Sequence, residues 1–351
     1  MSKYFNSFYK ELTPYTPGEQ PQDKKYIKLN TNESPYIPAP GVIDVINSKE
    51  AADLRLYSDP ELKPLKAELA RAYGVEPKNV FVGNGSDEVL YFAFMAFGEA
   101  GLKFADITYG CYKVFAAVNG LKTEIVPLKD DLSLDPSDYM DSGKAVVIAN
   151  PNAPTGMTIS LEDIAEIAKS NAGSVVMIDE AYVDFGAESA VELTKEFDNL
   201  LVVQTFSKSR SLAGARVGYA IGNEELIADL ETLKFSFNPY NVNRLSMAAA
   251  VEAVKAADYY KDACGKIAAT REWTTKELTK LGFTVLPSKS NFIFAKTPDY
   301  DGKKLYLDLK DRGILIRHFD SARISDYNRI TIGTQEDMET FVATVKELLA
   351  K

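Results

Sequence analysis

The chain has 351 residues, of which 46% are hydrophobic and 26% charged, and this composition is typical of a globular protein with a sizeable core. Its formal net charge of −10 disfavours a broad nucleic-acid surface, so any anionic ligand must be small and bound by local cations. Cys111 and Cys264 have no paired spacing and His318 is the only histidine, which argues against a disulfide scaffold, a cysteine- or histidine-rich metal site and most Ser/His or Cys/His catalytic sites.

The first two thirds of the chain predict an open α/β sheet. After an irregular segment to about residue 40, the apolar spacing over 61–74 predicts a helix that ends at Gly74. Short apolar runs rich in β-branched residues then alternate with helical stretches such as 161–170, and this alternation indicates buried parallel strands. The predicted strands span residues 79–83, 103–109, 145–150, 174–180, 201–206 and 217–222.

The pattern changes after residue 238 and predicts a smaller α+β domain. A long helical region over 242–281 is followed by short apolar runs, a helix over 303–313 and a last helix over 338–350. We expect an N-terminal arm over 1–40 that packs near the small domain, a large cofactor-binding domain over 41–240 and a small C-terminal domain over 241–351. The ligand is expected between the two domains. The predicted strands of the small domain lie in residues 283–288, 291–296, 314–319 and 329–333.

Polar residues follow the predicted strands, where an open α/β sheet binds its ligands. Ser86 and Asp87 begin a helix after two glycines, a turn that either cradles a phosphate or forms an ordinary helix cap. Tyr109 follows the next strand and is either a stacking ring or a core residue. The turn over 150–156 carries Asn152 and is either a binding turn or a plain connection.

The next two strand ends carry an acid and an amine. Asp179 and Tyr182 leave an apolar strand directly, and a carboxylate there needs a partner, which is a helix cap, a salt bridge or a cationic ring nitrogen. Lys208 alone reads as a solvated charge, but Ser207 precedes it and Arg216 follows eight residues later. Pyridoxal phosphate requires an amine, an acid, phenols and an anion site, because it binds through a lysine imine and a protonated pyridine nitrogen.

Motifs along nearly the whole chain carry a family resemblance. The sequence resembles the class I and II aminotransferases of fold type I, which use pyridoxal 5′-phosphate, and most closely the histidinol-phosphate aminotransferase branch. The resemblance implies an α/β fold whose large domain has a mainly parallel central sheet flanked by helices, with a smaller α+β domain. The motifs are LTPY (12–15), LNTNESP (29–35), GNGSDE (83–88), NPNAPTG (150–156), DEAY (179–182), TFSK (205–208), LAGARVGY (212–219), PYNVN (239–243), ILIRHF (314–319) and RITIGT (329–334).

The resemblance implies a role for each matching residue at the cofactor. Lys208 would hold the cofactor as a Schiff base and move the proton at the substrate Cα, and Asp179 would pair with the pyridine nitrogen. Tyr182 would donate to the phenolic oxygen, and Tyr109 would stack on the ring. Tyr57 would come from a partner subunit, which implies a homodimer with shared active sites. The implied cofactor-binding residues are Tyr57, Ser86, Asp87, Tyr109, Asn152, Asp179, Tyr182, Thr205, Ser207, Lys208 and Arg216.

The resemblance also implies the substrates. Tyr15, Arg317 and Arg329 match the family's substrate-binding positions, and two arginines in an acidic protein suit small anions, although surface ion pairs are the plain alternative. The implied reaction exchanges an amino group between L-histidinol phosphate and 2-oxoglutarate in histidine biosynthesis. The sequence has no apolar segment near the roughly 20 residues of a membrane span and no signal-peptide pattern, so we expect a cytoplasmic enzyme without membrane or nucleic-acid partners.

The sequence departs from the family pattern at three places. Ala153 stands where the family usually has an asparagine before the proline of PTG, which leaves open whether Asn152 replaces that contact. The residues after Tyr57 read SDP, and ITYGCY (107–112) lacks the usual proline before its TY.

Other functions remain as alternatives. An aromatic aminotransferase or a threonine-phosphate decarboxylase would keep Lys208, so only substrate-facing residues distinguish them. A silent cofactor-binding regulator usually carries a DNA-binding segment, which the sequence lacks. A nucleotide-binding protein is disfavoured because no Walker lysine follows the glycines of GNGSDE.

Overall fold

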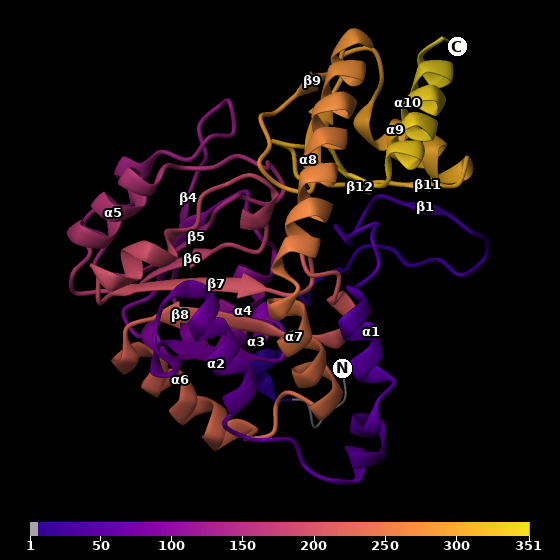
Figure 1. Cartoon of the computed structure of the whole chain (residues 1–351). Coiled ribbons are helices and arrows are strands. Elements are labelled where there is room, and N and C mark those ends of the chain that lie inside the picture. Colours follow the sequence, from indigo (N-terminus) through magenta and orange to yellow (C-terminus); the bar gives the residue numbers. More distant parts are fainter. Residues whose placement is uncertain (1–5, 351) are drawn as a thin grey trace.

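The computed structural model describes residues 6–350 and is built around a seven-stranded sheet with helices on its faces (Figure 1). The strand order is β2-β8-β7-β6-β5-β3-β4, and the pairs from β7 to β4 are parallel. The large sheet consists of β2 (Val80–Gly83), β3 (Leu102–Ala105), β4 (Thr123–Val126), β5 (Ala145–Ala149), β6 (Val176–Asp179), β7 (Leu200–Thr205) and β8 (Gly218–Gly222).

The central strands are apolar on both sides because both faces of the sheet are covered. In β6, Val176 and Ile178 enter one core cluster, whereas Met177 enters the cluster on the other face. This explains why the strands read as continuous apolar runs rather than as alternating ones. The α-helices are α1 (Pro40–Ile46), α2 (Lys63–Tyr73), α3 (Ser86–Phe97), α4 (Cys111–Val118), α5 (Leu161–Ser170), α6 (Glu224–Phe237), α7 (Arg244–Lys255), α8 (Ala257–Lys280), α9 (Gly302–Asp311) and α10 (Gln335–Leu349).

Several helix ends follow from local sequence. Helix α5 begins with a capping box in which Ser160 and Asp163 bond each other's backbone amides, and α2 ends at Gly74, whose φ of 62° suits a glycine. The predicted helices at 61–74 and 161–170 are therefore confirmed to within two residues. Short 3-10 helices complete the list: η1 (Ser7–Tyr9), η2 (Lys49–Arg55), η3 (Pro77–Asn79), η4 (Pro136–Tyr139), η5 (Val183–Phe185), η6 (Ala190–Lys195) and η7 (Ala213–Ala215).

A second, four-stranded sheet lies in the C-terminal part, with the antiparallel order β12-β13-β10-β9. The long helix α8 runs from the large sheet's side of the molecule up to this part (Figure 1). The N-terminal segment also reaches it, because β1 pairs in parallel with β11 and Leu29 enters the apolar core there. The strands of this part are β1 (Ile27–Lys28), β9 (Thr284–Val285), β10 (Phe292–Lys296), β11 (Ile314–Leu315), β12 (Arg317–His318) and β13 (Asn328–Thr331).

Some predicted elements were wrong in detail. Strand β8, predicted as parallel, runs antiparallel to both of its neighbours, β2 and β7. Strand β4 was not predicted, because it lies at the sheet edge and most of its side chains are not buried. The helical region over 242–281 is broken at Ala256 into α7, which packs against α1 and α2, and the longer α8.

Over residues 6–350, each helix is too short or too polar to span a lipid bilayer.

Candidate active site

A cavity of about 520 Å³ lies at the carboxyl ends of β5, β6 and β7. The parallel register places Asp179 beside Ala149 on one neighbouring strand and Val203 on the other, so the residues that follow these strands meet at one edge. The N-terminal segment and the start of α3 close the cavity. The predicted site residues that line it are Tyr15, Ser86, Asp87, Tyr109, Asp179, Tyr182, Thr205, Ser207, Lys208 and Arg216.

Lys208 follows β7 and turns its amine into this cavity. Its Nζ donates a hydrogen bond to the Thr31 carbonyl at 3.1 Å and lies 5.9 Å from the centre of the Tyr182 ring. Thr205, at the end of β7, is buried, and its hydroxyl accepts a hydrogen bond from the Ser207 amide at 3.1 Å. The Thr205 side chain therefore holds the turn before the lysine, and the amine is available to a ligand in the cavity.

Asp179 is the last residue of β6 and is only 5% exposed. One carboxylate oxygen accepts from the Tyr112 hydroxyl at 2.7 Å and the other from the Ala181 amide at 3.2 Å. Burial raises the pKa of Asp179 to about 6, although these hydrogen bonds and the charge of Lys208 act to lower it. A cationic nitrogen in the cavity would lower this pKa again, since an opposite charge favours the ionised carboxylate.

The start of α3 forms an anion site with Arg216. The helix begins at Ser86 without a side-chain cap, so its first backbone amides can bind an anion. The Arg216 guanidinium contacts the Asp87 carboxylate at 3.1 Å and the Ser207 hydroxyl at 3.4 Å. Gly85 has a φ of 82°, and a Cβ there would lie 2.5 Å from Arg216, so only glycine lets the arginine approach.

Backbone strain at Arg216 and burial of Tyr109 occur beside the same carboxylate, that of Asp87. Arg216 has a φ of 54°, a left-handed conformation that costs about 1–3 kcal/mol in a residue other than glycine and is concentrated at functional sites. The Tyr109 hydroxyl donates to the Asp87 carboxylate at 2.8 Å, and burial together with that carboxylate raises the pKa of Tyr109. Asp87 thus fixes both a cation and an aromatic ring at the cavity wall.

A second cavity of about 430 Å³ adjoins the first and carries the two predicted substrate arginines. Arg317 on β12 and Arg329 on β13 are directly opposite each other in the antiparallel register. Like charges in that position repel, so a bound anion would relieve the repulsion. Tyr15, Tyr109, Tyr182 and Lys208 line both cavities, which places the arginines within one continuous group of site residues.

Both guanidinium groups are partly bound by the backbone. Arg317 donates to the carbonyls of Thr16 at 3.0 Å and Pro17 at 3.1 Å, and Arg329 donates to that of Asn30 at 2.9 Å. Burial lowers the pKa of Arg329, and its Nε is buried without a hydrogen-bond partner among the described residues. A buried cation with an unused donor is well suited to a substrate anion.

Two predicted cofactor residues lie away from the first cavity. The Asn152 amide is bonded inside its own turn region, accepting from Thr108 at 2.8 Å and donating to Ile107 at 3.0 Å and Thr155 at 3.1 Å. Its place at the cavity wall is taken by Ala153, which has no polar side-chain atom. Tyr57 is 78% exposed and stacks on Tyr240 with ring centres 4.4 Å apart.

Two polar residues that hold the site were not predicted from the sequence. Tyr112 lies in the first turn of α4, three residues after Tyr109, and its closeness in sequence to that predicted site residue was the available signal. Asn32 donates to the Tyr182 hydroxyl at 2.9 Å from 150 residues away, and no local pattern predicts such a contact.

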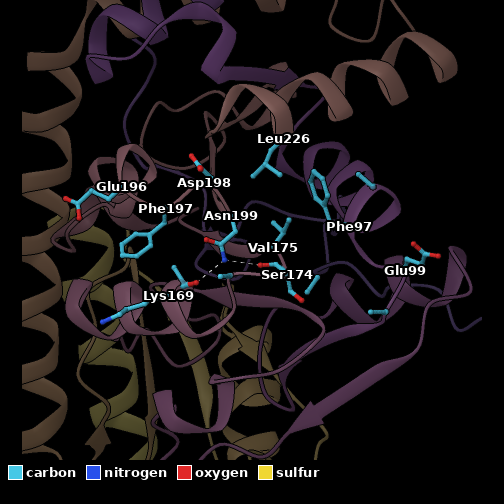
Figure 2. Close-up of a pocket in the computed structure, with 16 residues that line it drawn as sticks. Phe97, Glu99, Lys169, Ser174, Val175, Glu196, Phe197, Asp198, Asn199 and Leu226 are labelled. Carbon is cyan, nitrogen blue, oxygen red and sulfur yellow. Dashed lines mark hydrogen bonds between the residues drawn. The ribbon is translucent and has the colours of Figure 1, made fainter.

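A larger hollow of about 1000 Å³ lies at the other edge of the sheet, at the amino ends of β5, β6 and β7 (Figure 2). Asn199 lies within it and donates to the carbonyls of Ala168, Asn171 and Ser174 at 2.8–3.0 Å. These bonds tie the segment before β7 to the end of α5 and the loop that follows it, so this residue serves the connections between elements.

The fold and the cavity are those of a known enzyme class. Residues 24–345 match the family model of aminotransferase class I and II, and the chain belongs to this family. It is 51% identical to the histidinol-phosphate aminotransferase of Brachyspira hyodysenteriae, with 99% of each chain covered. It is 52% identical to the enzyme of the same name from a Marinomonas species, with 99% of this chain and 100% of the relative covered.

A solved structure agrees with this assignment. The histidinol-phosphate aminotransferase of Sinorhizobium meliloti, solved in complex with pyridoxal-5′-phosphate, superposes with a TM-score of 0.85 at 28% identity. The match covers 93% of this chain and 92% of the other. The predicted fold class, a fold-type I aminotransferase with a mainly parallel large sheet, is confirmed.

Proposed function

We propose that the protein is a pyridoxal-phosphate-dependent transaminase that exchanges an amino group between L-histidinol phosphate and 2-oxoglutarate in histidine biosynthesis. The products are imidazole-acetol phosphate and L-glutamate. The observation that carries the proposal is a single cavity that holds the Lys208 amine, the buried Asp179 carboxylate and the anion site of α3 and Arg216. Full-length relatives at about half identity support the choice of substrate.

The residues in the cavity fit the cofactor. A phosphate fits the uncapped start of α3, beside Arg216 and the Ser207 hydroxyl. A protonated ring nitrogen fits Asp179, because burial raises the pKa of that carboxyl and a cation beside it offsets the cost of burial. Tyr109 and Tyr182 line the same cavity.

Each residue then has a defined task. When bound, pyridoxal phosphate supplies a carbonyl carbon for amines and a ring that accepts the electron pair released at the substrate Cα. The Lys208 amine would hold that carbonyl group, and the same amine would accept and return the proton at the substrate Cα. Asp179 would hold the proton on the ring nitrogen, which would keep the ring electron-poor.

The second cavity orients the substrate. Arg329 and Arg317 provide paired donors for the phosphate of histidinol phosphate in one half-reaction and for the carboxylates of glutamate or 2-oxoglutarate in the other. Tyr15 lies between the two cavities, and burial raises the pKa of its phenol, which favours the neutral, hydrogen-bonding form. Together these three side chains hold the reacting amine near Lys208.

We further propose a cytoplasmic homodimer in which Tyr57 enters the partner's cavity. Tyr57 and its stacking partner Tyr240 are both exposed in the single chain, and exposed aromatic pairs favour burial at an interface. Arg244 holds the Tyr57 carbonyl at 3.1 Å and pairs with Glu50 at 3.4 Å, so the segment is fixed before any partner binds. The division into an arm over 1–40, a large domain over 41–240 and a small domain over 241–351 also stays a proposal.

A half-reaction followed by spectroscopy tests the proposed function. The purified protein should absorb visible light, and histidinol phosphate and glutamate, added separately, should each shift this absorbance to that of the amine form. Lys208→Ala should lose both the visible band and turnover, whereas Lys169→Ala, at the other edge of the sheet, should retain both. A response to phenylalanine but not to histidinol phosphate would move the protein to an aromatic aminotransferase, and normal turnover by Lys208→Ala would contradict the assignment.

A further inference from the structure

We propose that Asn32 is a positioning residue that sets the direction of the Tyr182 hydroxyl proton, turning it into the cavity. The inference rests on the proposed function, because the group that receives this hydrogen bond is the phenolic oxygen of the cofactor. Asn32 is only 1% exposed and its amide donates to the Tyr182 hydroxyl at 2.9 Å. Asn32 lines the second cavity but not the first, and it meets the first cavity through Tyr182.

The hydrogen bonds around Asn32 fix which way its amide group points. The Asn32 backbone amide donates to the Thr331 hydroxyl at 3.1 Å, so that oxygen already accepts one bond. The single hydroxyl proton of Thr331 is then free to donate to the Asn32 side-chain oxygen, which lies 2.8 Å away. Because the side-chain oxygen faces Thr331, the side-chain NH₂ group must face Tyr182.

The direction of the tyrosine proton follows. The Tyr182 oxygen accepts the Asn32 bond, so its own proton cannot point at Asn32 and is available on the cavity side. A phenol that accepts one hydrogen bond is also a stronger donor in the next. Lys208 and Arg329, two charged groups near this phenol, are cations and do not accept a proton from it. Asp179 also lines the cavity, but it accepts from Tyr112 and the Ala181 amide.

The backbone of Asn32 is held from the C-terminal sheet. Its φ is 58°, a left-handed conformation that asparagine tolerates better than most residues. Asn291, next to β10, donates its amide to the Asn32 carbonyl at 3.0 Å, and Phe292 and Thr331 are register partners on β10 and β13. Contacts from the small sheet therefore hold the residue that orients the hydroxyl proton of Tyr182, and Tyr182 follows β6 of the large sheet.

The residues at 152 and 153 make this proton more important. Ala153 lines the cavity and carries no donor, and Asn152 is bonded to Thr108 and Ile107 instead. Tyr182 consequently offers the cavity a proton that neither Ala153 nor Asn152 supplies. A hydrogen bond from this proton to the phenolic oxygen of the cofactor stabilises the ionised oxygen and lowers the pH at which the cofactor's visible band titrates.

The test is a pH titration of the visible absorbance of the holoenzyme. Asn32→Asp is isosteric but has no NH₂ group, so its carboxylate accepts the Tyr182 proton and withdraws it from the cofactor. We expect the titration midpoint to rise by about one pH unit, the tenfold factor of a single hydrogen bond, and to approach that of Tyr182→Phe. Thr331→Val, which releases the Asn32 amide without adding charge, should raise the midpoint by less, and Thr331→Ser should titrate like the wild type.

A double variant separates proton direction from the added charge. If Asn32→Asp acts through Tyr182, it should add no further shift in a Tyr182→Phe background. A full additional shift there would mean that the new carboxylate acts directly and would overturn the inference. The inference would also be overturned if Tyr182→Phe shifted the titration midpoint but Asn32→Asp and Thr331→Val did not. That result would leave the proposed function intact. A wild-type protein without a visible band would contradict the proposed function itself.

Discussion

The two edges of the large sheet carry similar residues but differ in what those residues can bind. At the amino edge, the hollow of about 1000 Å³ is lined by Lys169, Asp198 and Asn199 (Figure 2). The Asn199 side-chain amide already donates hydrogen bonds to three backbone carbonyls. At the carboxyl edge, a cavity half that size holds Lys208 and Asp179 on neighbouring strand ends. The smaller space is the better candidate because its polar groups converge and are desolvated.

The same contrast recurs between two adjacent carboxyl groups. Glu180 is as buried as Asp179, but it accepts from Ala190 and Ser189 at 2.6 Å and from Gln204 at 2.8 Å. Asp179 lines the cavity and Glu180 does not. Burial raises the pKa of both groups, so a perturbed pKa alone does not identify the one that meets a ligand.

The largest expected effect on activity comes from removing a carboxylate charge at the carboxyl edge rather than at the amino edge. Asp179→Asn keeps the shape of the side chain but removes the charge that would hold the ring proton, and we expect kcat to fall on the order of 10²–10³-fold. Asp198→Asn makes the same chemical change at the amino edge and should leave kcat near that of the wild type. Steady-state kinetics with histidinol phosphate measure both, and equal losses in the two variants would break the comparison.

A smaller effect is expected from two matched glycine substitutions. Gly85→Ala places a methyl group 2.5 Å from Arg216 at a φ of 82°, whereas Gly173→Ala at the amino edge meets nothing within 4 Å. Gly85→Ala should weaken cofactor affinity by roughly 5–150-fold, the equivalent of about 1–3 kcal/mol of backbone strain. Titration of the apoprotein with pyridoxal phosphate gives the dissociation constant. An unchanged constant in Gly85→Ala, or an equal loss in Gly173→Ala, would remove the anion site from the proposal.

The smallest effect on activity is expected from substitution of Glu180. This substitution should instead change how the unfolding free energy depends on pH. Burial raises the pKa of Glu180 from 4.5 to about 7, so the folded state binds this proton more tightly than the unfolded state. Its contribution to the unfolding free energy is therefore complete below pH 4.5 and is lost as the pH rises through about 7. Asp179 contributes with the same sign, but it is present in both proteins and cancels when Glu180→Gln is compared with the wild type.

Thermal unfolding between about pH 5 and 8 measures this difference. The midpoint of Glu180→Gln relative to the wild type should rise with pH, because the introduced amide does not titrate and the wild type loses stability. A difference that stays constant over this range would show that Glu180 has the same pKa in the folded and unfolded states.

Local sequence patterns determined the parts of this protein that depend on short-range physics. Apolar runs indicated β2, β5, β6 and β7 because strands buried on both faces need apolar side chains throughout. They also directed attention to Asp179 and Lys208, because polar residues directly after a buried strand meet at the carboxyl edge. The motifs around them were specific enough to indicate the family.

Only the tertiary structure decided which groups face one another. The direction of β8 follows from strand pairing across the sheet, and the opposition of Arg317 and Arg329 follows from the register of β12 and β13. The hydrogen bond from Asn32 to Tyr182 joins residues 150 positions apart. Such contacts depend on how distant elements pack, and no periodicity within one segment records them.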